Sequence, residues 1–435
     1  MSIQSNTSTL ILADKLIDGK GGSAIEDAGV LLFGPIIKAI GTRSDFDGLA
    51  SDKVTVLKFT GKTIMPGMVD THTHHTGFGD GRSGDDLAEL PNEVLVLQAA
   101  KNARAALYSG VTSARENGAK DYTTFKLRQA IQEGITEGPR LVLCGPPIST
   151  IGGHLGYFGG EVTGQTEARA MVRRHVKEGA DYIKITATGG TTKTSFPWLS
   201  SLNVDELTAI TDEAHKFGKL TATHCLSTQG IINSLDANVD MIIHCIFNNP
   251  DGSSDFRKDV AERIGEQGAY INPTLHVLKS RIWALLKTQE SRTLTPQEKL
   301  DLDDRKRFYD IRLEHCHKLI EMGLKIVTGS DSSWGDYKLG NTPYETEALV
   351  DAGFSPMEGI VSVTSEAANS IGIGEKVGII EAGKEADIII VDGDPSKDIK
   401  ALWNVENVFK SGRELDRGSE SSRDRSRQYP PPSLP

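Results

Sequence analysis

Residues 66–75 read PGMVDTHTHH and place three of the chain's 11 histidines within four positions, directly after an apolar run. Side chains of an extended strand alternate between its two faces, so His72 and His74 share one face and His75 points to the other. Two imidazoles on one face can hold a metal ion together, although polar residues at a strand end explain the pair equally well. The rest of the chain must distinguish these interpretations.

From residue 63 onward, β-type runs alternate with amphipathic helical patterns, which are clearest at 166–180 and 203–218. Eight strands are expected, at 63–70, 110–116, 140–145, 181–189, 219–225, 239–245, 268–274 and 324–331. Eight strands alternating with helices predict a closed α/β structure, the (β/α)8 TIM-like barrel. The long connection at 275–323 is expected to carry extra helices near the barrel mouth.

The two chain ends follow a different pattern. Short strands punctuated by glycine occur at 9–41 and again after residue 375. They predict a small β-sandwich domain formed from both chain ends, with the barrel inserted between its halves. The expected segments are 1–62 and 376–413 for the sandwich, 63–375 for the catalytic barrel and 414–435 for a disordered tail rich in Ser, Arg and Pro.

The composition is that of an ordinary soluble protein, with 38% hydrophobic and 25% charged residues in 435. A formal charge of −11 argues against nucleic acid or an anionic membrane as the main partner. There is neither a run of about 18 apolar residues nor a signal-like N-terminus. The four cysteines form no disulfide framework and no CxxC pair, so we expect buried, reduced thiols in a cytoplasmic protein.

Metal-ligating residue types recur where the predicted strands end, which is where barrel enzymes build their sites. The first strand ends in His72 and His74, and later strands carry Lys184, His224, His244 and Asp331. Taken singly, each has a plain explanation, such as a hydrogen-bonded core histidine or an aspartate in a turn. Taken together, the imidazoles and the carboxylate predict a metal site at the barrel mouth.

Lys184 lies between two isoleucines in the fourth predicted strand. A lysine directed into a barrel interior is costly as an ammonium ion, so burial lowers its pKa and favours the neutral amine. A neutral amine can react with carbon dioxide to form a carbamate, which offers two anionic oxygens to two metal ions. The alternative is an ion pair with Asp331 or another carboxylate, without metal.

Several residues on the predicted mouth loops are candidates for binding substrate. His154, in a Gly-Gly-His turn, is expected to hydrogen-bond a substrate carbonyl or oxyanion, unless it only completes the turn. Arg115, at the end of the second strand, could clamp a substrate carboxylate or pair with Glu116. Aromatic residues that line an apolar pocket, or merely pack, are Tyr157, Phe196, Trp198 and Trp334.

Two further histidines lie close to these elements. His75 is expected to pack or hydrogen-bond behind the metal-binding face. His276, which follows the seventh predicted strand, is a weaker candidate for a residue that supports a metal ligand.

These segments resemble the amidohydrolase superfamily over nearly the whole chain. The matching motifs are PGMVDTHTH (66–74), DYIKITATGG (181–190), THC (223–225), IIHC (242–245), TGSD (328–331) and GIIEAGKEADIIIVDGDP (378–395). The chain looks similar to the sub-group of Xaa-Pro dipeptidases and ochratoxin-hydrolysing amidases, whereas its loop at 191–203 departs from the usual dipeptidase sequence. In this superfamily, a lysine on the fourth strand marks the binuclear type.

The resemblance implies that His72, His74 and Asp331 hold the more buried of two divalent metal ions. It implies that His224 and His244 hold the other, and that N-carboxylated Lys184 bridges the two. Zinc is the expected metal, and manganese, cobalt or nickel are also compatible with these ligands.

The activity implied is metal-dependent hydrolysis, by metal-activated hydroxide, of the amide bond in a dipeptide or N-acyl amino acid. Asp331 would act as the proton shuttle, and the chain would form a homo-oligomer. The alternatives are a hydrolase of a xenobiotic amide or carbamate, of the mycotoxin or herbicide type, and a non-catalytic scaffold.

Overall fold

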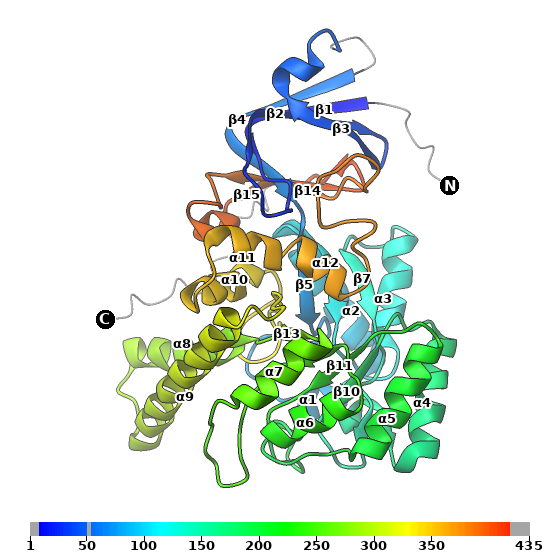
Figure 1. Ribbon diagram of the computed structural model, residues 1–435, viewed down its shortest axis with the longest axis vertical. Helices are drawn as coiled ribbons and strands as arrows, with labels where there is room; N and C mark the ends of the chain where they lie inside the picture. Colours follow the sequence, from blue (N-terminus) through cyan, green and yellow to red (C-terminus); the bar gives the residue numbers. More distant parts are fainter. Residues whose placement is uncertain (1–7, 50–53, 418–435) are drawn as a thin grey trace.

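Parallel strands with helices between them form a barrel, and both chain ends meet in a separate sheet above it (Figure 1). The computed structural model describes residues 8–49 and 54–417. This arrangement confirms the predicted fold, because one small β-domain is made from segments on either side of the barrel.

Seven strands of the barrel are β5 (Met68–Thr73), β6 (Val111–Glu116), β7 (Arg140–Leu143), β10 (Ile183–Thr186), β11 (Thr221–His224), β12 (Met241–Ile243) and β13 (Tyr270–Asn272). They form two parallel arcs, β5–β6–β7 and β10–β11–β12–β13. The segment at 326–328 takes the eighth position, because the Val327 amide donates to the Ile271 carbonyl and the Thr71 amide donates to the Thr328 carbonyl.

The barrel strands are shorter than predicted, and they lose residues at one end or at both. The first barrel strand begins at Met68, and residues 63–66 belong instead to the preceding strand of the sheet above. His244, Cys245 and Asp331 have φ values of 65°, 52° and 57°, in the left-handed region. That conformation ends regular strand pairing. The side chains of His244 and Asp331 line the cavity at the mouth, whereas Cys245 packs in the apolar core.

Helices surround the barrel and connect its strands. They are α1 (Gly84–Ala88), α2 (Asn92–Tyr108), α3 (Thr123–Gln132), α4 (Gly164–Glu178), α5 (Val204–Lys216), α6 (Thr228–Asp236), α7 (Lys258–Gln267), α8 (Leu275–Ser291), α9 (Pro296–Glu321), α10 (Thr342–Asp351), α11 (Pro356–Ser362) and α12 (Ser365–Ser370). The predicted patterns at 166–180 and 203–218 correspond to α4 and α5. The connection at 275–323 does carry extra helices, α8 and α9.

The upper sheet has seven strands in the order β16–β15–β14–β4–β1–β2–β3. Its strands are β1 (Ser8–Leu16), β2 (Ile25–Phe33), β3 (Ile36–Thr42), β4 (Val54–Pro66), β14 (Ile388–Asp392), β15 (Val405–Lys410) and β16 (Arg413–Glu414), and a small extra pair is β8 (Ser149–Thr150) and β9 (Glu161–Val162). The two ends join where β14 pairs antiparallel with β4. Apolar residues of both ends, such as Ile11, Ile64 and Phe409, share one core cluster.

The two predicted limits of this sheet domain need correction. Because β4 runs to Pro66, the limit at residue 62 falls inside a strand. At the other end, Glu414 pairs in β16, and Leu415 and Arg417 are buried, so these residues pack against the sheet domain. The remainder of the predicted tail, 418–435, lies outside the described residues.

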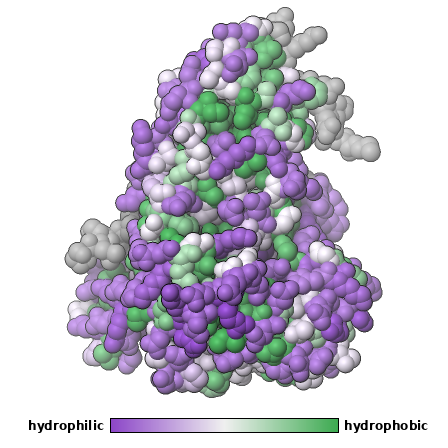
Figure 2. Space-filling view, viewed as in Figure 1, coloured by the Kyte–Doolittle hydropathy of each residue, from purple (hydrophilic) through white to green (hydrophobic). Residues whose placement is uncertain are grey.

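Most of the face seen in Figure 2 is hydrophilic, and hydrophobic residues show mainly over the upper sheet. All four cysteines are buried and unpaired, as predicted. None of the described helices is both long enough and apolar enough to cross a membrane.

Candidate active site

His72, His74 and Asp331 form a buried group at the barrel mouth. His72 lies near the end of β5 and His74 directly follows that strand. Asp331 reaches them from the segment after the eighth strand position, where its amide donates to the His72 carbonyl at 2.8 Å. The Nε2 atoms of His72 and His74 lie 3.3 and 3.4 Å from Asp331 Oδ1. One ligand atom from each residue lies within 4.8 Å of the others, so a single ion fits among them.

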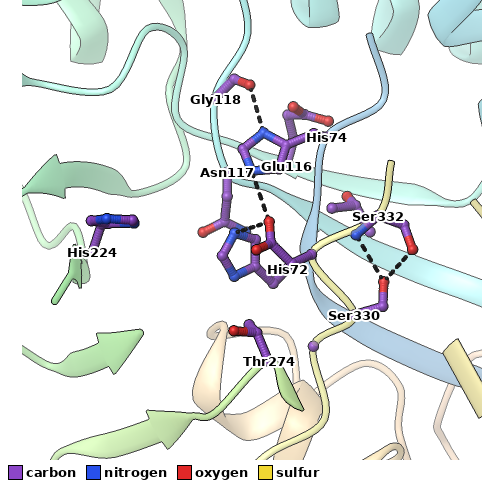
Figure 3. A network of polar contacts seen from close by, with 12 residues as sticks. His72, His74, Glu116, Asn117, Gly118, His224, Thr274, Ser330 and Ser332 are labelled. Atoms are coloured by element: carbon purple, nitrogen blue, oxygen red, sulfur yellow. Dashed lines mark hydrogen bonds and ion pairs between the residues drawn. The ribbon is translucent and has the colours of Figure 1, made fainter. Parts of the chain in front are cut away.

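The hydrogen bonds of the two imidazoles decide which nitrogen faces that position. His72 Nδ1 lies 2.9 Å from Asn272 Oδ1. His74 Nδ1 lies 3.0 Å from the Gly118 carbonyl oxygen (Figure 3). Both partners accept, so Nδ1 carries the proton and Nε2 keeps its lone pair. Asp331 Oδ1 has no hydrogen-bond donor among the described residues. Three electron pairs therefore face one another, an arrangement that a cation stabilises.

His224 and His244 form a second pair across the mouth, with His224 opposite the β5 histidines in Figure 3. His224 Nδ1 and His244 Nε2 are 2.9 Å apart. The outer nitrogens contact oxygens, since His224 Nε2 lies 3.2 Å from the Gly189 carbonyl and His244 Nδ1 lies 2.6 Å from Thr274 Oγ1. The rings of His72 and His244 are 5.5 Å apart, so the pair adjoins the first group.

Burial keeps these imidazoles neutral, as metal ligation requires. Removal from water is the main cause that holds the pKa values of His72, His224 and His244 well below the usual 6.5. Lys184 contributes to all three shifts as a nearby positive charge.

Lys184, from β10, is buried and lines the same cavity as both groups. Burial, followed by the charge of Arg115, lowers the pKa of its amine to about 7. The amine makes no hydrogen bond or ion pair with any residue in 8–49 or 54–417, so the ion pair with Asp331 that the sequence left open is not formed. An unpaired amine whose pKa lies near neutrality is partly unprotonated at pH 7 and is therefore chemically suited to form a carbamate.

The cavity above these residues has a volume of about 450 Å³. Its wall is mainly apolar, and its aromatic members are Trp198, Phe308 and Trp334. The Trp334 ring stacks on His74 with centroids 4.9 Å apart. A cavity of this size and lining accommodates a small organic molecule next to the candidate ligands.

His154 also lines the cavity, with its ring 4.4 Å from that of His224. Its Nδ1 lies 3.1 Å from Thr192 Oγ1, and burial lowers its pKa to about 3, so the ring is neutral near pH 7. A Cβ on Gly190 would meet three ring atoms at 2.6 Å, so only glycine lets the chain pass this close. The position agrees with a hydrogen-bonding role toward substrate.

Arg115 does not lie in the cavity wall. Its guanidinium is buried and donates from Nε to the Thr71 carbonyl at 2.8 Å, above the ring of Tyr182. The predicted contact with a substrate carboxylate does not fit this placement. The alternative ion pair with Glu116 is not formed either, because Glu116 accepts from His75 Nδ1 at 2.7 Å. That bond confirms that His75 lies behind the metal-binding face.

Two of the predicted aromatic wall residues, Tyr157 and Phe196, also lie outside the cavity lining. Tyr157 packs in a satellite cluster beside Leu87 and Phe158, and Phe196 is exposed beside Trp198. For Tyr157 the simple packing explanation therefore holds. Trp198 and Trp334 line the cavity as expected.

Sequence reasoning missed the residues that orient the ligands. Asn272 and Thr274 follow the seventh strand in the motif INPT, where two polar residues at a strand end were a usable signal. Arg312 of α9 is buried and donates to the carbonyl oxygens of His244 and Cys245, the two residues with left-handed backbone after β12. No local pattern marks Arg312, because its partners lie about 67 residues away in sequence.

Comparison with known proteins gives consistent matches. The model of the amidohydrolase family matches residues 63–415. Ochratoxinase of Aspergillus niger is 26% identical over 450 aligned residues, covering 93% of this chain and 86% of the relative. A Xaa-Pro dipeptidase structure with methionine bound in the active site has a TM-score of 0.78 and 29% identity, covering 94% of this chain and 100% of that one. The A. niger ochratoxinase structure has a TM-score of 0.77 and 25% identity, covering 94% and 95% of the two chains.

Proposed function

This chain belongs to the amidohydrolase family of hydrolases, and we propose that it cleaves the amide bond of a dipeptide or N-acyl amino acid with the help of two divalent metal ions. The observation that carries the proposal is the set of facing lone pairs on His72, His74 and Asp331. Buried groups of this kind repel one another without a cation and bind one strongly.

The donors divide naturally between two ions. His72, His74 and Asp331 would hold one, and the facing nitrogens of His224 and His244 would hold the other. Lys184 would bridge them after N-carboxylation, in which the amine nitrogen bonds to the carbon of carbon dioxide and releases one proton to solvent. Neutral imidazoles with carboxylate oxygens suit zinc, and also manganese, cobalt or nickel.

Divalent ions bound here would polarise a substrate carbonyl and lower the pKa of water. Asp331 would accept the proton of the attacking water and return it to the departing nitrogen, so that the C–N bond breaks as an acid and an amine form. His154 would donate a hydrogen bond to the carbonyl oxygen as negative charge develops there.

The substrate class rests on the cavity and on the relatives. A mainly apolar cavity of about 450 Å³ suits a dipeptide or N-acyl amino acid with an apolar side chain. The dipeptidase relative binds methionine in its active site, which supports the same class.

Hydrolysis of a xenobiotic aromatic amide is the second candidate. Trp198 lies in the divergent loop at 191–203 and lines the cavity, and a relative is an ochratoxinase. Rates for dipeptides and N-acyl amino acids against aromatic amides would separate the two. The third alternative, a non-catalytic scaffold, is disfavoured by a complete ligand set beside a cavity.

The test is a metal count coupled to activity. Wild-type protein should bind about two equivalents of zinc after reconstitution, lose amidase activity on chelation and regain it with metal. Lys184→Met should bind at most one equivalent and lose more than about 100-fold in kcat, since each ion contributes several kcal/mol to the transition state.

Lys177→Met, at an exposed position on α4, is the matched control and should retain both ions and full activity. Full turnover by the metal-free wild type, or two tightly bound ions in Lys184→Met, would contradict the proposal.

A further inference from the structure

One wall of the cavity comes from α8 and α9, the helices inserted between the last two barrel positions. α8 contributes Val277, Leu278 and Arg281, spaced so that they share a helix face, and α9 contributes Arg305 and Phe308. The wall is thus apolar except for two arginines. The only carboxylate that lines the cavity within the described chain is Asp331, which belongs to the metal-binding group.

The two arginines differ in their partners. Arg305 Nε donates to Asp301 at 2.8 Å, one turn earlier on the same helix. Arg281 is half-buried, and its guanidinium makes no hydrogen bond or ion pair with residues 8–49 or 54–417. A cation held against apolar surface without an anion is costly, and a bound carboxylate would supply the missing partner.

Arg281 also lies near the candidate metal site. Its Nε is 4.0 Å from the point where a Cβ on Gly335 would stand. Gly335 directly follows Trp334, whose ring stacks on His74 at 4.9 Å. Arg281 and His74 therefore border the same cavity, whereas Arg115 is not part of its lining.

We propose that Arg281 binds the free carboxylate of the substrate, and that the substrate is therefore an amide whose leaving amine is an α-amino acid. This inference rests on the proposed amidase activity. The planar guanidinium can bind a carboxylate through two parallel hydrogen bonds, which fixes the orientation of the scissile bond relative to the metal ligands. Arg281 is thus a specificity residue that does not take part in the bond-breaking step.

The test compares matched substrates. A panel of N-acyl amino acids and dipeptides identifies the best substrate, which is then paired with its amino-alcohol counterpart, where CH2OH replaces the carboxylate. Wild-type enzyme should favour the carboxylate by about 10-fold to 100-fold in kcat/KM, the range for a hydrogen-bonded charged group. Arg281→Gln should lose this preference through KM, with kcat and the alcohol's kcat/KM nearly unchanged.

Two further variants complete the test. Arg281→Lys should keep part of the preference, because it retains the charge but not the bidentate geometry. Arg307→Gln, an exposed arginine on α9 that pairs with Asp304, is the control and should behave as wild type. Turnover with the carboxylate preference intact in Arg281→Gln would overturn this inference alone, whereas no turnover of any compound by the metal-loaded wild type would overturn the proposed function and this inference with it.

Discussion

The metal-binding end of the barrel and the aromatic cluster of His276, Trp283, Tyr337 and Tyr344 both contain buried imidazoles, yet they hold them differently. Each candidate histidine ligand has one ring nitrogen next to an oxygen atom and the other facing another candidate ligand. His276 has no partner for either ring nitrogen within the described chain, and its ring packs 4.8 Å from Tyr344 and 4.2 Å from Tyr337.

Burial lowers the histidine pKa in both regions, so a shifted pKa alone does not identify a ligand. The difference lies in orientation. A hydrogen bond between an oxygen and one ring nitrogen fixes the orientation of the ring and so directs the other nitrogen toward the metal position. Thr274 makes this contact with His244. His276, only two residues further on, has no such contact within the described chain.

The largest effect should come from Asp331→Asn. The amide cannot accept a proton and is a weaker metal ligand, so kcat should fall by about 1,000-fold or more, and the first metal should bind more weakly. Steady-state kinetics and metal analysis at saturating zinc would measure both. The exposed Asp351→Asn, which ends α10, should leave both unchanged. Normal turnover by Asp331→Asn with its metals retained would refute the proton-shuttle role.

A smaller effect should follow from Thr274→Val, which keeps the shape but removes the oxygen that orients His244. Affinity for the second metal should fall by about 10-fold to 100-fold, the usual cost of losing such a partner. Competition with a chromogenic chelator would measure it. Thr288→Val makes the same change on α8, away from the cavity, and should not alter affinity. Equal affinities in all three proteins would mean that ring orientation is set by packing alone.

The smallest effect is expected for His276→Phe, and it is a gain in folding stability where the other two variants lose turnover or metal affinity. The change removes two buried, unpaired polar atoms and keeps an aromatic ring, so the variant should gain about 1–3 kcal/mol of stability. Metal content should stay at the wild-type value. A lower unfolding temperature than wild type would show that His276 has a polar partner after all.

This variant also makes a pH prediction. The His276 pKa lies well below 6.5 in the folded protein, so below pH 6.5 the unfolded chain takes up a proton there that the folded chain does not. Above pH 6.5 this proton uptake does not affect the free energy of unfolding, and below pH 6.5 it lowers that free energy as the pH falls. The stability advantage of His276→Phe should therefore be larger at pH 5.5 than at pH 7.5, and calorimetric unfolding at the two values would measure it.

Much of the candidate site could be predicted from the sequence, because its ligands end strands. The carboxyl ends of parallel strands meet at one rim of a barrel, so residues as distant as His72 and Asp331 could be placed together without coordinates. Strand lengths were predicted less well. Left-handed residues such as His244 and Asp331 stop the pairing early, and residue type does not mark this conformation.

The fold class, the two-ended sheet domain and the candidate metal-ligating residues could all be predicted from the sequence, because periodicity and the order of strands along the chain are local properties. Which arginine borders the cavity depends instead on how distant segments pack together. Arg115 is fixed by its strand register beneath the metal-binding residues, where it donates to Thr71. Arg281 borders the cavity because α8 packs against α9 and the loop after Asp331, contacts between segments far apart in the chain whose geometry no local pattern encodes.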